Sequence, residues 1–328
     1  MKKALKISAI VIGLLLLVII ALPFLFKGKI QKTVQSEINK NLNAVVTFDG
    51  VGLSLIRHFP DLTVKVKNLV VKGTGDFSAD TLASVPGLSL TLDLASVFGG
   101  SEYKVKQIDL KAPRFLFKVL KNGKVNWDVM KPSATADTVS TPSTFKVYLN
   151  KVSISDMRMV YDDAEIPTML ALDGLTGTMS GDMTADITSL DIKAVVKDIT
   201  ADYDGIRYMS KTTGEITTLL NANLSTWTFT FKDGNLRLND LNIKADGFFA
   251  MPDNGYNMDI KFAAKENTFK AFLSLIPAIY AKDFENVKTS GNMAFDGFVK
   301  GLYNDVSIPA FAVNLKVANG SFSYPGLP

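Results

Sequence analysis

A strict alternation of apolar and polar residues recurs along most of this chain and limits the folds that it can adopt. The alternation runs through Leu62–Val66 and Leu88–Leu94, and it returns at intervals as far as Phe311–Val317. Successive side chains of a β-strand point to opposite faces of a sheet. The pattern therefore predicts strands that each have one apolar and one polar face.

Turn signals lie between several of these segments. Asn122-Gly123, Asp233-Gly234 and Asp253-Asn254-Gly255 are combinations typical of tight turns. Such turns join neighbouring strands that run antiparallel. We therefore expect a mainly β body built from antiparallel strands.

Two arrangements of these strands fit the alternation equally well. A β-sandwich would bury two apolar faces against each other. A single long, curved antiparallel sheet would instead leave an apolar groove, which needs an occupant such as lipid acyl chains. The candidate groove residues are Leu62, Val64, Val66, Leu88, Leu90, Leu92, Leu94, Phe115, Phe117, Phe229, Phe231, Phe311, Val313 and Leu315.

The N-terminus carries an apolar run from Ile7 to Phe26 that contains no charged residue. At ~1.5 Å per residue a helix of this length covers roughly 30 Å, the thickness of the hydrocarbon core of a bilayer. A cleavable signal peptide is the alternative, but it needs a shorter core and small residues at its cleavage site. Large residues end this run, at Leu22–Phe26. The sequence thus predicts an uncleaved transmembrane signal-anchor over 7–26.

Lysines flank both ends of this run, so the positive-inside rule discriminates weakly between the two orientations. An N-terminal anchor before a long body is most simply inserted with its N-terminus inside. We expect a cytoplasmic N-terminus at 1–6, a single membrane pass, and a body exported from the cytoplasm.

The body divides into three parts. Residues 27–130 begin with an amphipathic helix, whose stripe of Ile30, Val34, Ile38 and Leu42 could lie on the membrane or cap the first strands. They continue into a first β segment. The polar, proline-containing stretch 131–144 is typical of a flexible linker.

The third part, residues 145–328, continues the β pattern with one interruption. A helix is expected at about 267–284, because Phe269, Phe272 and Ile276 follow helical spacing. Asn267 can cap the start of this helix, and Pro277 should kink or end it.

Residues that support catalysis or metal binding are sparse. The chain has no cysteine, and its single histidine, His58, has no histidine or cysteine partner for a metal site. The acidic pairs Asp162-Asp163 and Asp202/Asp204 are more typical of turns than of metal sites. We expect no enzyme activity and no cofactor. An enzyme would need a second functional group near His58 or near Asp202 and Asp204.

The charge pattern gives no support for a nucleic-acid partner. The formal net charge is +4, and the lysines are scattered through the chain rather than clustered. Proteins that bind the phosphate backbone concentrate lysine and arginine on one surface. No nucleic-acid partner is therefore expected.

A series of short motifs resembles the AsmA family of membrane-anchored envelope proteins. After the signal-anchor, the resembling segments are Glu37–Leu42, Val46–Phe48, Val51–Leu55, Phe59-Pro60, Leu69–Gly73, Ile108–Pro113, Asn122–Asp128, Thr289–Phe295 and Pro309–Pro328. The stretch Asn122–Asp128 is similar to a recurring family signature of a strand, an Asn-Gly turn and an Asn-Trp pair. The resemblance covers residues 1–130 and 285–328 well and is thin between them.

The resemblance implies a bacterial inner-membrane anchor that bears a periplasmic β-groove. The AsmA family is related to TamB and to the chorein-type bridge-like proteins that conduct phospholipids between membranes. It has been linked to outer-membrane assembly and lipid homeostasis, and it offers no catalytic residues to carry over. The expected partners are phospholipid acyl chains, the inner membrane and outer-membrane assembly components. Because the pattern stops at Pro328 in mid-course, we expect an N-terminal fragment or a short member of the family.

The residues and the resemblance together leave two functions open. The first is a non-enzymatic, membrane-anchored groove for phospholipid transport and lipid homeostasis in the bacterial envelope. The second is a structural β-sandwich scaffold that recruits outer-membrane protein assembly factors. A groove should carry bound lipid, whereas the packed interior of a sandwich should not.

Overall fold

The computed structural model describes residues 39, 42–55, 58–99, 103–131, 145–146, 149–183, 186–273, 275 and 288–323. The expected membrane segment 7–26, most of the expected helix from Ile30 to Leu42 and nearly all of the expected linker 131–144 lie outside these ranges. Within them, no helix combines the length and the apolar character that a membrane crossing requires.

The described part of the chain is mainly β, as the alternation predicts. The first strands are β1 (Ala44–Thr47), β2 (Gly50–Ser54), β3 (Leu62–Gly73), β4 (Thr81–Leu92), β5 (Tyr103–Lys111), β6 (Arg114–Val119), β7 (Phe145–Lys146) and β8 (Lys151–Asp163). The later strands are β9 (Thr168–Ser180), β10 (Ile187–Tyr203), β11 (Ile206–Asn223), β12 (Thr228–Leu238), β13 (Leu241–Ala250), β14 (Tyr256–Thr268), β15 (Lys288–Tyr303) and β16 (Ala310–Ser323). The helices are α2 (Leu94–Gly99), α3 (Phe269–Leu273) and the 3₁₀ helix η1 (Gly75–Phe77).

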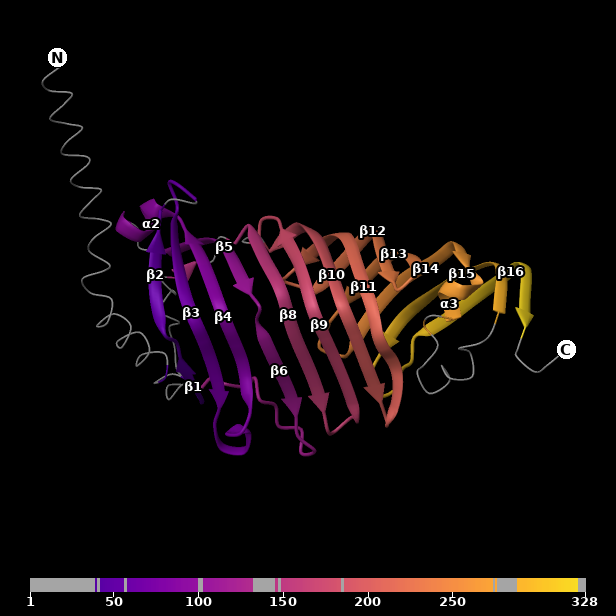
Figure 1. The fold of residues 1–328 in the computed structure, drawn as a ribbon, viewed down its shortest axis with the longest axis horizontal. Coiled ribbons are helices and arrows are strands. Elements are labelled where there is room, and N and C mark those ends of the chain that lie inside the picture. The colour runs from indigo at the N-terminus through magenta and orange to yellow at the C-terminus, as the bar shows by residue number, and fades with distance from the viewer. Residues whose placement is uncertain are drawn as a thin grey trace, which may run out of the picture.

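These strands form one 16-stranded sheet rather than the two stacked sheets of a sandwich. Its order is β1-β3-β4-β5-β8-β9-β10-β11-β12-β13-β14-β15-β16, with β2 beside β3, β6 beside β4 and β8, and β7 beside β5. In the view of Figure 1 the strands from β3 to β11 lie side by side, and β12 to β14 pass behind at a steep angle. The sheet is therefore long and strongly curved.

The expectation of a wholly antiparallel sheet is wrong at β8. This strand runs parallel to both β5 and β6, and β7 also pairs parallel with β5. β5 and β6 follow one another along the same strand line, and both pair with β4 and β8. Because β8 runs parallel to them, the connection from β6 to β8 must return to the start of this line. A parallel pair requires a crossover connection of this kind. The sequence did not reveal this crossover, because a crossover connection has no characteristic turn residues.

The register of the sheet aligns apolar side chains from strand to strand. One row crosses from β2 to β10, and a second crosses from β10 to β16. The first row is Leu53, Val64, Leu90, Ile108, Val152, Met179 and Ile192. The second row is Leu190, Leu220, Phe231, Gly247, Ile260, Val299 and Phe311. The face that bears both rows is called the apolar face below, and the opposite face the polar face.

β-Bulges keep the apolar residues on one face where the sequence changes phase. In β8 the apolar positions Val152 and Ile154 are followed by Met157 and Met159, so the step between the pairs is three residues instead of two. Asp156, with a φ of 53°, supplies the extra residue, and the register with β9 shifts at this point. If the strand continued through this three-residue step without a bulge, its second half would turn its apolar side chains to the polar face.

Positive φ angles recur in the neighbouring strands. They occur at Asn68 in β3, Ala112 between β5 and β6, Gly174 in β9, Lys211 in β11 and Asp233 in β12. Asp233-Gly234 is therefore a bulge inside β12 and not the hairpin turn that the sequence suggested. Asp204-Gly205, by contrast, forms the two-residue turn between β10 and β11, with positive φ at both residues.

A short helix covers part of the apolar face near the C-terminal end of the sheet. Ala271 of α3 packs with Leu241 and Ala264 in a buried cluster, and the rings of Phe272 and Phe295 meet edge to face at 5.3 Å. The described helix covers only Phe269–Leu273 of the expected 267–284, and residues 276–284 lie outside the described ranges.

The cap of this helix differs from the expectation. Thr268 Oγ1 accepts the bond from the Ala271 backbone N–H, which is the interaction expected of an N-cap. The Asn267 side chain instead accepts from the Asn242 backbone N–H and donates to its carbonyl oxygen. Asn267 therefore extends the pairing of β13, and its neighbour performs the capping.

Gly247 should tolerate no side chain. Its φ is +146°, and an added Cβ would collide with the carbonyl oxygen of Asp259. We expect Gly247→Ala to lower the free energy of unfolding by about 2–3 kcal/mol, because both backbone strain and a clash oppose it. Denaturant unfolding of the full chain in detergent measures this change. Gly52→Ala is the control, because its Cβ would lie 4.0 Å from the nearest atom and it should stay within about 1 kcal/mol. Equal effects of the two substitutions would contradict the prediction.

Candidate apolar binding face

The sequence-predicted groove residues include one group near each end of the sheet. The first group lies near the N-terminal end of the sheet, where Val64 faces Leu90 and Val66 faces Leu88 across β3 and β4. Leu62 faces Leu92 in the same way. The second group lies at the other end, where Phe311, Val313 and Leu315 belong to β16, and the rows in the register connect the two groups.

Leu94 does not belong to the apolar rows. β4 ends at Leu92, and Leu94 begins α2. Asp93 causes the change, because its Oδ1 accepts a 2.9 Å hydrogen bond from the Ser96 backbone N–H in the manner of a helix N-cap. The period-two pattern continued to Leu94 in the sequence by coincidence with the start of a helix.

Phe115 and Phe117 lie in the part of the apolar face that follows the bulges. Phe115 faces Ala83 of β4 and Met159 of β8. Its ring stacks on that of Phe117 at 6.1 Å, and Phe117 meets Trp127 edge to face at 5.9 Å. Phe229 and Phe231 of β12 face Ala222 and Leu220, respectively, so they extend the face on the other side of β10.

Most large side chains of this face are only partly buried. Val64, Leu90, Ile108, Phe117 and Phe231 all retain intermediate exposure. Extensive contacts between strands occur between neighbours in the sheet, and no second described sheet is stacked on the face. The described elements therefore leave much of this face without a covering layer.

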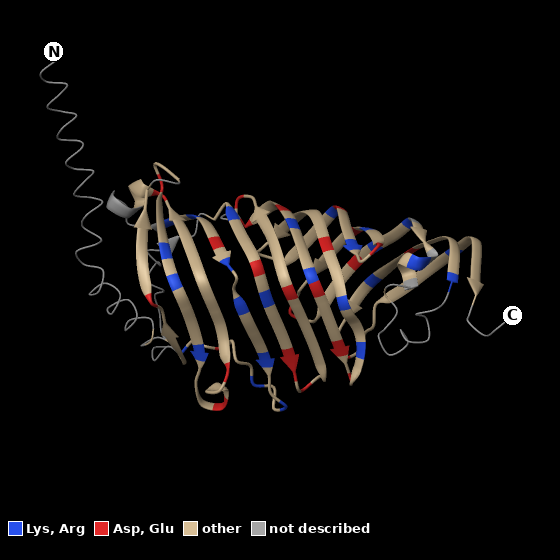
Figure 2. Ribbon diagram, viewed as in Figure 1, with Lys and Arg blue, Asp and Glu red and all other residues tan. Residues whose placement is uncertain are grey.

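The polar face carries charges of both signs. Figure 2 shows lysine and arginine interspersed with aspartate and glutamate along the strands from β3 to β11. A shallow hollow of about 570 Å³ lies on this face, lined chiefly by small hydroxyl side chains such as Ser89, Ser153 and Thr178, with Lys111 and Lys193. The two faces thus differ sharply in chemistry, as an amphipathic single-layer sheet requires.

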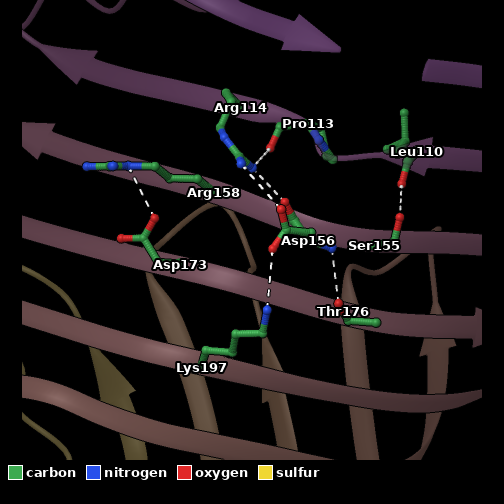
Figure 3. Close-up of polar contacts among 9 residues, drawn as sticks. All are labelled: Leu110, Pro113, Arg114, Ser155, Asp156, Arg158, Asp173, Thr176 and Lys197. Atoms are coloured by element: carbon green, nitrogen blue, oxygen red, sulfur yellow. Dashed lines mark hydrogen bonds and ion pairs between the residues drawn. The ribbon is translucent and has the colours of Figure 1, made fainter. Parts of the chain in front are cut away.

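A network of polar contacts surrounds the bulge at Asp156 (Figure 3). Arg114 of β6 and Lys197 of β10 each approach its carboxylate, at 3.4 Å and 3.6 Å. Its backbone N–H donates to Thr176 Oγ1 at 3.0 Å. Nearby, Arg158 pairs with Asp173 at 3.3 Å. The network links four strands at the position where their regular pairing is interrupted.

Substitutions at Asp156 should separate backbone geometry from charge. Both ion pairs are exposed, and such pairs contribute about 0–1 kcal/mol each. Asparagine also adopts positive φ readily. Asp156→Asn should therefore cost at most about 1 kcal/mol of unfolding free energy, whereas the β-branched Asp156→Val should cost more, about 1–3 kcal/mol. Denaturant unfolding of both variants tests this order, and a larger loss for asparagine than for valine would contradict it.

The titratable residues that could have suggested catalysis have structural partners. Asp202 accepts two hydrogen bonds from the Arg207 guanidinium, at 2.7 Å and 2.9 Å, and this contact lowers the pKa of its carboxyl group. Asp163 accepts from the Tyr161 hydroxyl and from the backbone of the following turn, which lowers its pKa as well. His58 contacts Thr63 Oγ1 at 3.0 Å. No cluster of metal-ligating side chains occurs among the described residues.

The segment Asn122–Asp128 folds back onto β6. The buried Asn126 side chain donates to the Leu116 carbonyl oxygen at 2.7 Å and accepts from the Lys118 backbone N–H at 2.9 Å. It therefore takes the place of a neighbouring strand for these two backbone groups. Trp127, next in the chain, packs its ring on Phe117. The Asn-Trp pair thus joins the crossover to the apolar face.

The AsmA family matches residues 1–274 of the chain. This range contains the apolar run 7–26, the Asn122–Asp128 segment and the apolar rows from β2 to β14. The chain belongs to the AsmA family. The match extends through the central strands, where the motif resemblance was thin, and ends before the C-terminal motifs at 285–328. No curated protein and no solved structure gave a significant match to this AsmA-family protein.

Several members of the apolar face were missed by the sequence analysis. Ile108, Val152, Met179 and Ile192 occupy the first row but were not among the candidates. Bulges break the alternation beside Ile108 and Val152, and allowing one step of three residues within those strands would have found them. Ile192 instead lies in the regular alternation of Leu190, Ile192, Ala194 and Val196, and it was missed although a strict period of two reveals it.

Proposed function

We propose that this AsmA-family protein is a non-enzymatic, membrane-anchored lipid-binding protein whose apolar face holds phospholipid acyl chains. The observation that carries the proposal is the pair of apolar rows, which runs without interruption by a charged residue from β2 to β16 while most of its large side chains stay partly exposed. A contiguous apolar surface of this extent marks a binding site in a soluble domain. Membership of the AsmA family is compatible with a role in the bacterial envelope.

The mechanism is passive. Burial of apolar area contributes ~25 cal/mol per Å², or about 0.8 kcal/mol for each methylene removed from water. Many equivalent side chains share this contribution, and no single contact dominates it. An acyl chain can therefore shift along the rows at little cost in binding free energy. Headgroups remain in water at the open edge of this face.

The proposed location follows from the N-terminal segment. An anchor at 7–26 would hold the protein in the inner membrane with the body in the periplasm. From there the apolar face would serve phospholipid transport, outer-membrane assembly and lipid homeostasis. Outer-membrane assembly components are the proposed protein partners, and no nucleic acid or cofactor is required.

Leu90→Asp should reduce bound phospholipid while the protein remains folded. Leu90 lies in the first row between Val64 and Ile108, and it is partly exposed, so an aspartate there keeps contact with water. We expect phospholipid carried through detergent exchange to fall by more than half, because a charge next to acyl chains is costly. Mass spectrometry of the full chain measures lipid, and thermal unfolding checks the fold.

Ser89→Asp is the matched control, because Ser89 directly precedes Leu90 in β4 and lies on the polar face between Lys65 and Asp109. It should keep the lipid content of the unaltered protein. Unchanged lipid in folded Leu90→Asp would contradict the proposed site. A strongly lowered melting temperature for Leu90→Asp, but not for Ser89→Asp, would show that this face is packed rather than open.

The anchor should remain uncleaved. The residues around Leu22–Phe26 are too large for a signal peptidase, which needs small side chains at its cleavage site. N-terminal sequencing of the protein extracted from membranes should therefore recover residues upstream of Lys27. A mature protein that starts near Gly28 would overturn this prediction.

A further inference from the structure

Beyond the second apolar row, a further row of apolar side chains lies nearer one rim of the sheet. It consists of Ala222, Phe229, Phe249 and Met258, which face one another in the register from β11 to β14. Each is two residues away from a member of the second row, so it lies on the same face of the sheet. The apolar face therefore extends to the turns in which these strands end.

Three successive turns form this rim, and we call them the lip. They are 224–227 between β11 and β12, 251–255 between β13 and β14, and 304–309 between β15 and β16. The Met251 backbone N–H donates to the Trp227 carbonyl oxygen at 3.1 Å. The Asn304 side-chain amide donates to the Asn254 carbonyl oxygen at 2.9 Å. These two hydrogen bonds join the turns into one continuous border of the apolar face.

Large apolar side chains of the lip and its flanking strand ends are exposed. Val306 and Ile308 are 89% and 82% exposed, and Trp227 is 55% exposed. The other exposed side chains of this kind are Leu224, Met251, Tyr256 and Tyr303. Asp253 and Asp305 are the only charged residues of the three turns. The lip is therefore apolar at its tips and aromatic where it meets the strands.

Trp227 is held in a backbone conformation that is unusual for a bulky residue. Its φ is 47°, in the left-handed region. Asn223 fixes the turn, because its Oδ1 accepts from the backbone N–H groups of Ser225 and Thr226, both at 3.1 Å. The indole meets the Phe229 ring edge to face at 6.4 Å. Strained residues of this kind are concentrated at functional sites. The turn thus presents an indole at the border of the apolar face.

The composition of the lip matches the interface of a phospholipid bilayer. Tryptophan and tyrosine are enriched at that interface because each has an apolar body and a polar tip. Exposed aliphatic side chains such as Ile308 can enter the boundary between headgroups and acyl chains. The two aspartates give no attraction to anionic lipids, so burial of apolar side chains must supply the binding free energy.

From these observations we propose that the lip inserts into the surface of a phospholipid bilayer and lets acyl chains pass between that bilayer and the apolar face. The proposal rests on the proposed lipid-binding function and names the place at which lipid enters or leaves. Phe229 and Phe249 lie directly behind the lip. They provide the first apolar surface that an entering acyl chain meets.

The two tryptophans of the chain make contact with a bilayer measurable. Trp127→Phe leaves Trp227 as the only tryptophan. The full chain with this substitution is reconstituted into phosphatidylcholine vesicles. Brominated phosphatidylcholine, which quenches tryptophan fluorescence on contact, is placed either in the same vesicles or only in vesicles that are added to them. We expect quenching of Trp227, and the mixture that quenches identifies the bilayer that the lip contacts.

Two further substitutions make the test specific. Ile308→Asp places a charge at an exposed tip of the lip and should lower the ratio of inserted to free lip at least about tenfold. Ile166→Asp is the matched control, because Ile166 is also exposed but lies in the turn between β8 and β9, at the opposite ends of the strands. It should leave the quenching unchanged. Both side chains are exposed, so neither variant should unfold the protein.

Leu90→Asp, added to Trp127→Phe, separates contact with the bilayer from contact with lipid on the apolar face. Mass spectrometry measures the bound phospholipid of the same sample. Quenching that persists while bound phospholipid falls supports the lip. Quenching that falls together with bound phospholipid would overturn the proposal and leave the proposed function intact. Quenching of a chain that never carries phospholipid would contradict the proposed function while the contact with the bilayer stands.

Two other results would also overturn the proposal. One is the absence of quenching in both vesicle mixtures, and sedimentation in detergent would then show whether a second copy of the chain covers the lip. The other is an equal loss of quenching in Ile308→Asp and Ile166→Asp, because the effect would then not depend on the lip.

Discussion

The structure depends on one constraint: backbone hydrogen bonds must pair the strands in a fixed register within a single sheet. A strand can keep its apolar side chains on one face only while its register with both neighbours is maintained, because a slip of one residue reverses every side chain. In this sheet the register is maintained over long strands by inserted residues such as Asp156 and Gly174. Each insertion strengthens the local twist and bend as well. Continuity of the face and curvature of the sheet therefore have the same origin.

In a sandwich, a second sheet buries the apolar side chains of the first. A single-layer sheet has no such second layer, so other interactions must stabilise it. The described buried core is small, and its clearest cluster lies where α3 meets Leu241 and Ala264. Most strands are stabilised by their neighbours in the sheet, by aromatic contacts such as Phe115 with Phe117, and by the polar network around Asp156. Ligand bound to the apolar face would add the burial that a second layer provides in other β proteins. In that case ligand binding would also stabilise the fold.

The two edge strands of the described sheet, β1 and β16, differ in their surroundings. Asn39 satisfies backbone groups of β1 at one edge, while β16 presents an exposed apolar strand at the other. The membrane anchor expected at the N-terminus precedes the protected edge in the chain.

Local patterns in the sequence were enough to predict the strands and the amphipathic character of the sheet. They were also enough to suggest the family. Alternation identified Val64, Leu90 and Phe117 because the side-chain period of a strand is a local property of the backbone. The motifs that resemble the AsmA family depend on local order for the same reason. The Asp204-Gly205 turn was likewise predictable, since positive φ at two successive residues has a strong compositional signal.

Only the tertiary structure decided how these strands are assembled. The parallel pairing of β8 with β5 and β6 depends on a crossover connection between β6 and β8, which no local pattern encodes. Asp233-Gly234 forms a bulge because β13 pairs past it on both sides, although the same dipeptide makes a turn elsewhere. The choice between a sandwich and one curved sheet depended on register across many strands, since both arrangements require the same alternation within each strand.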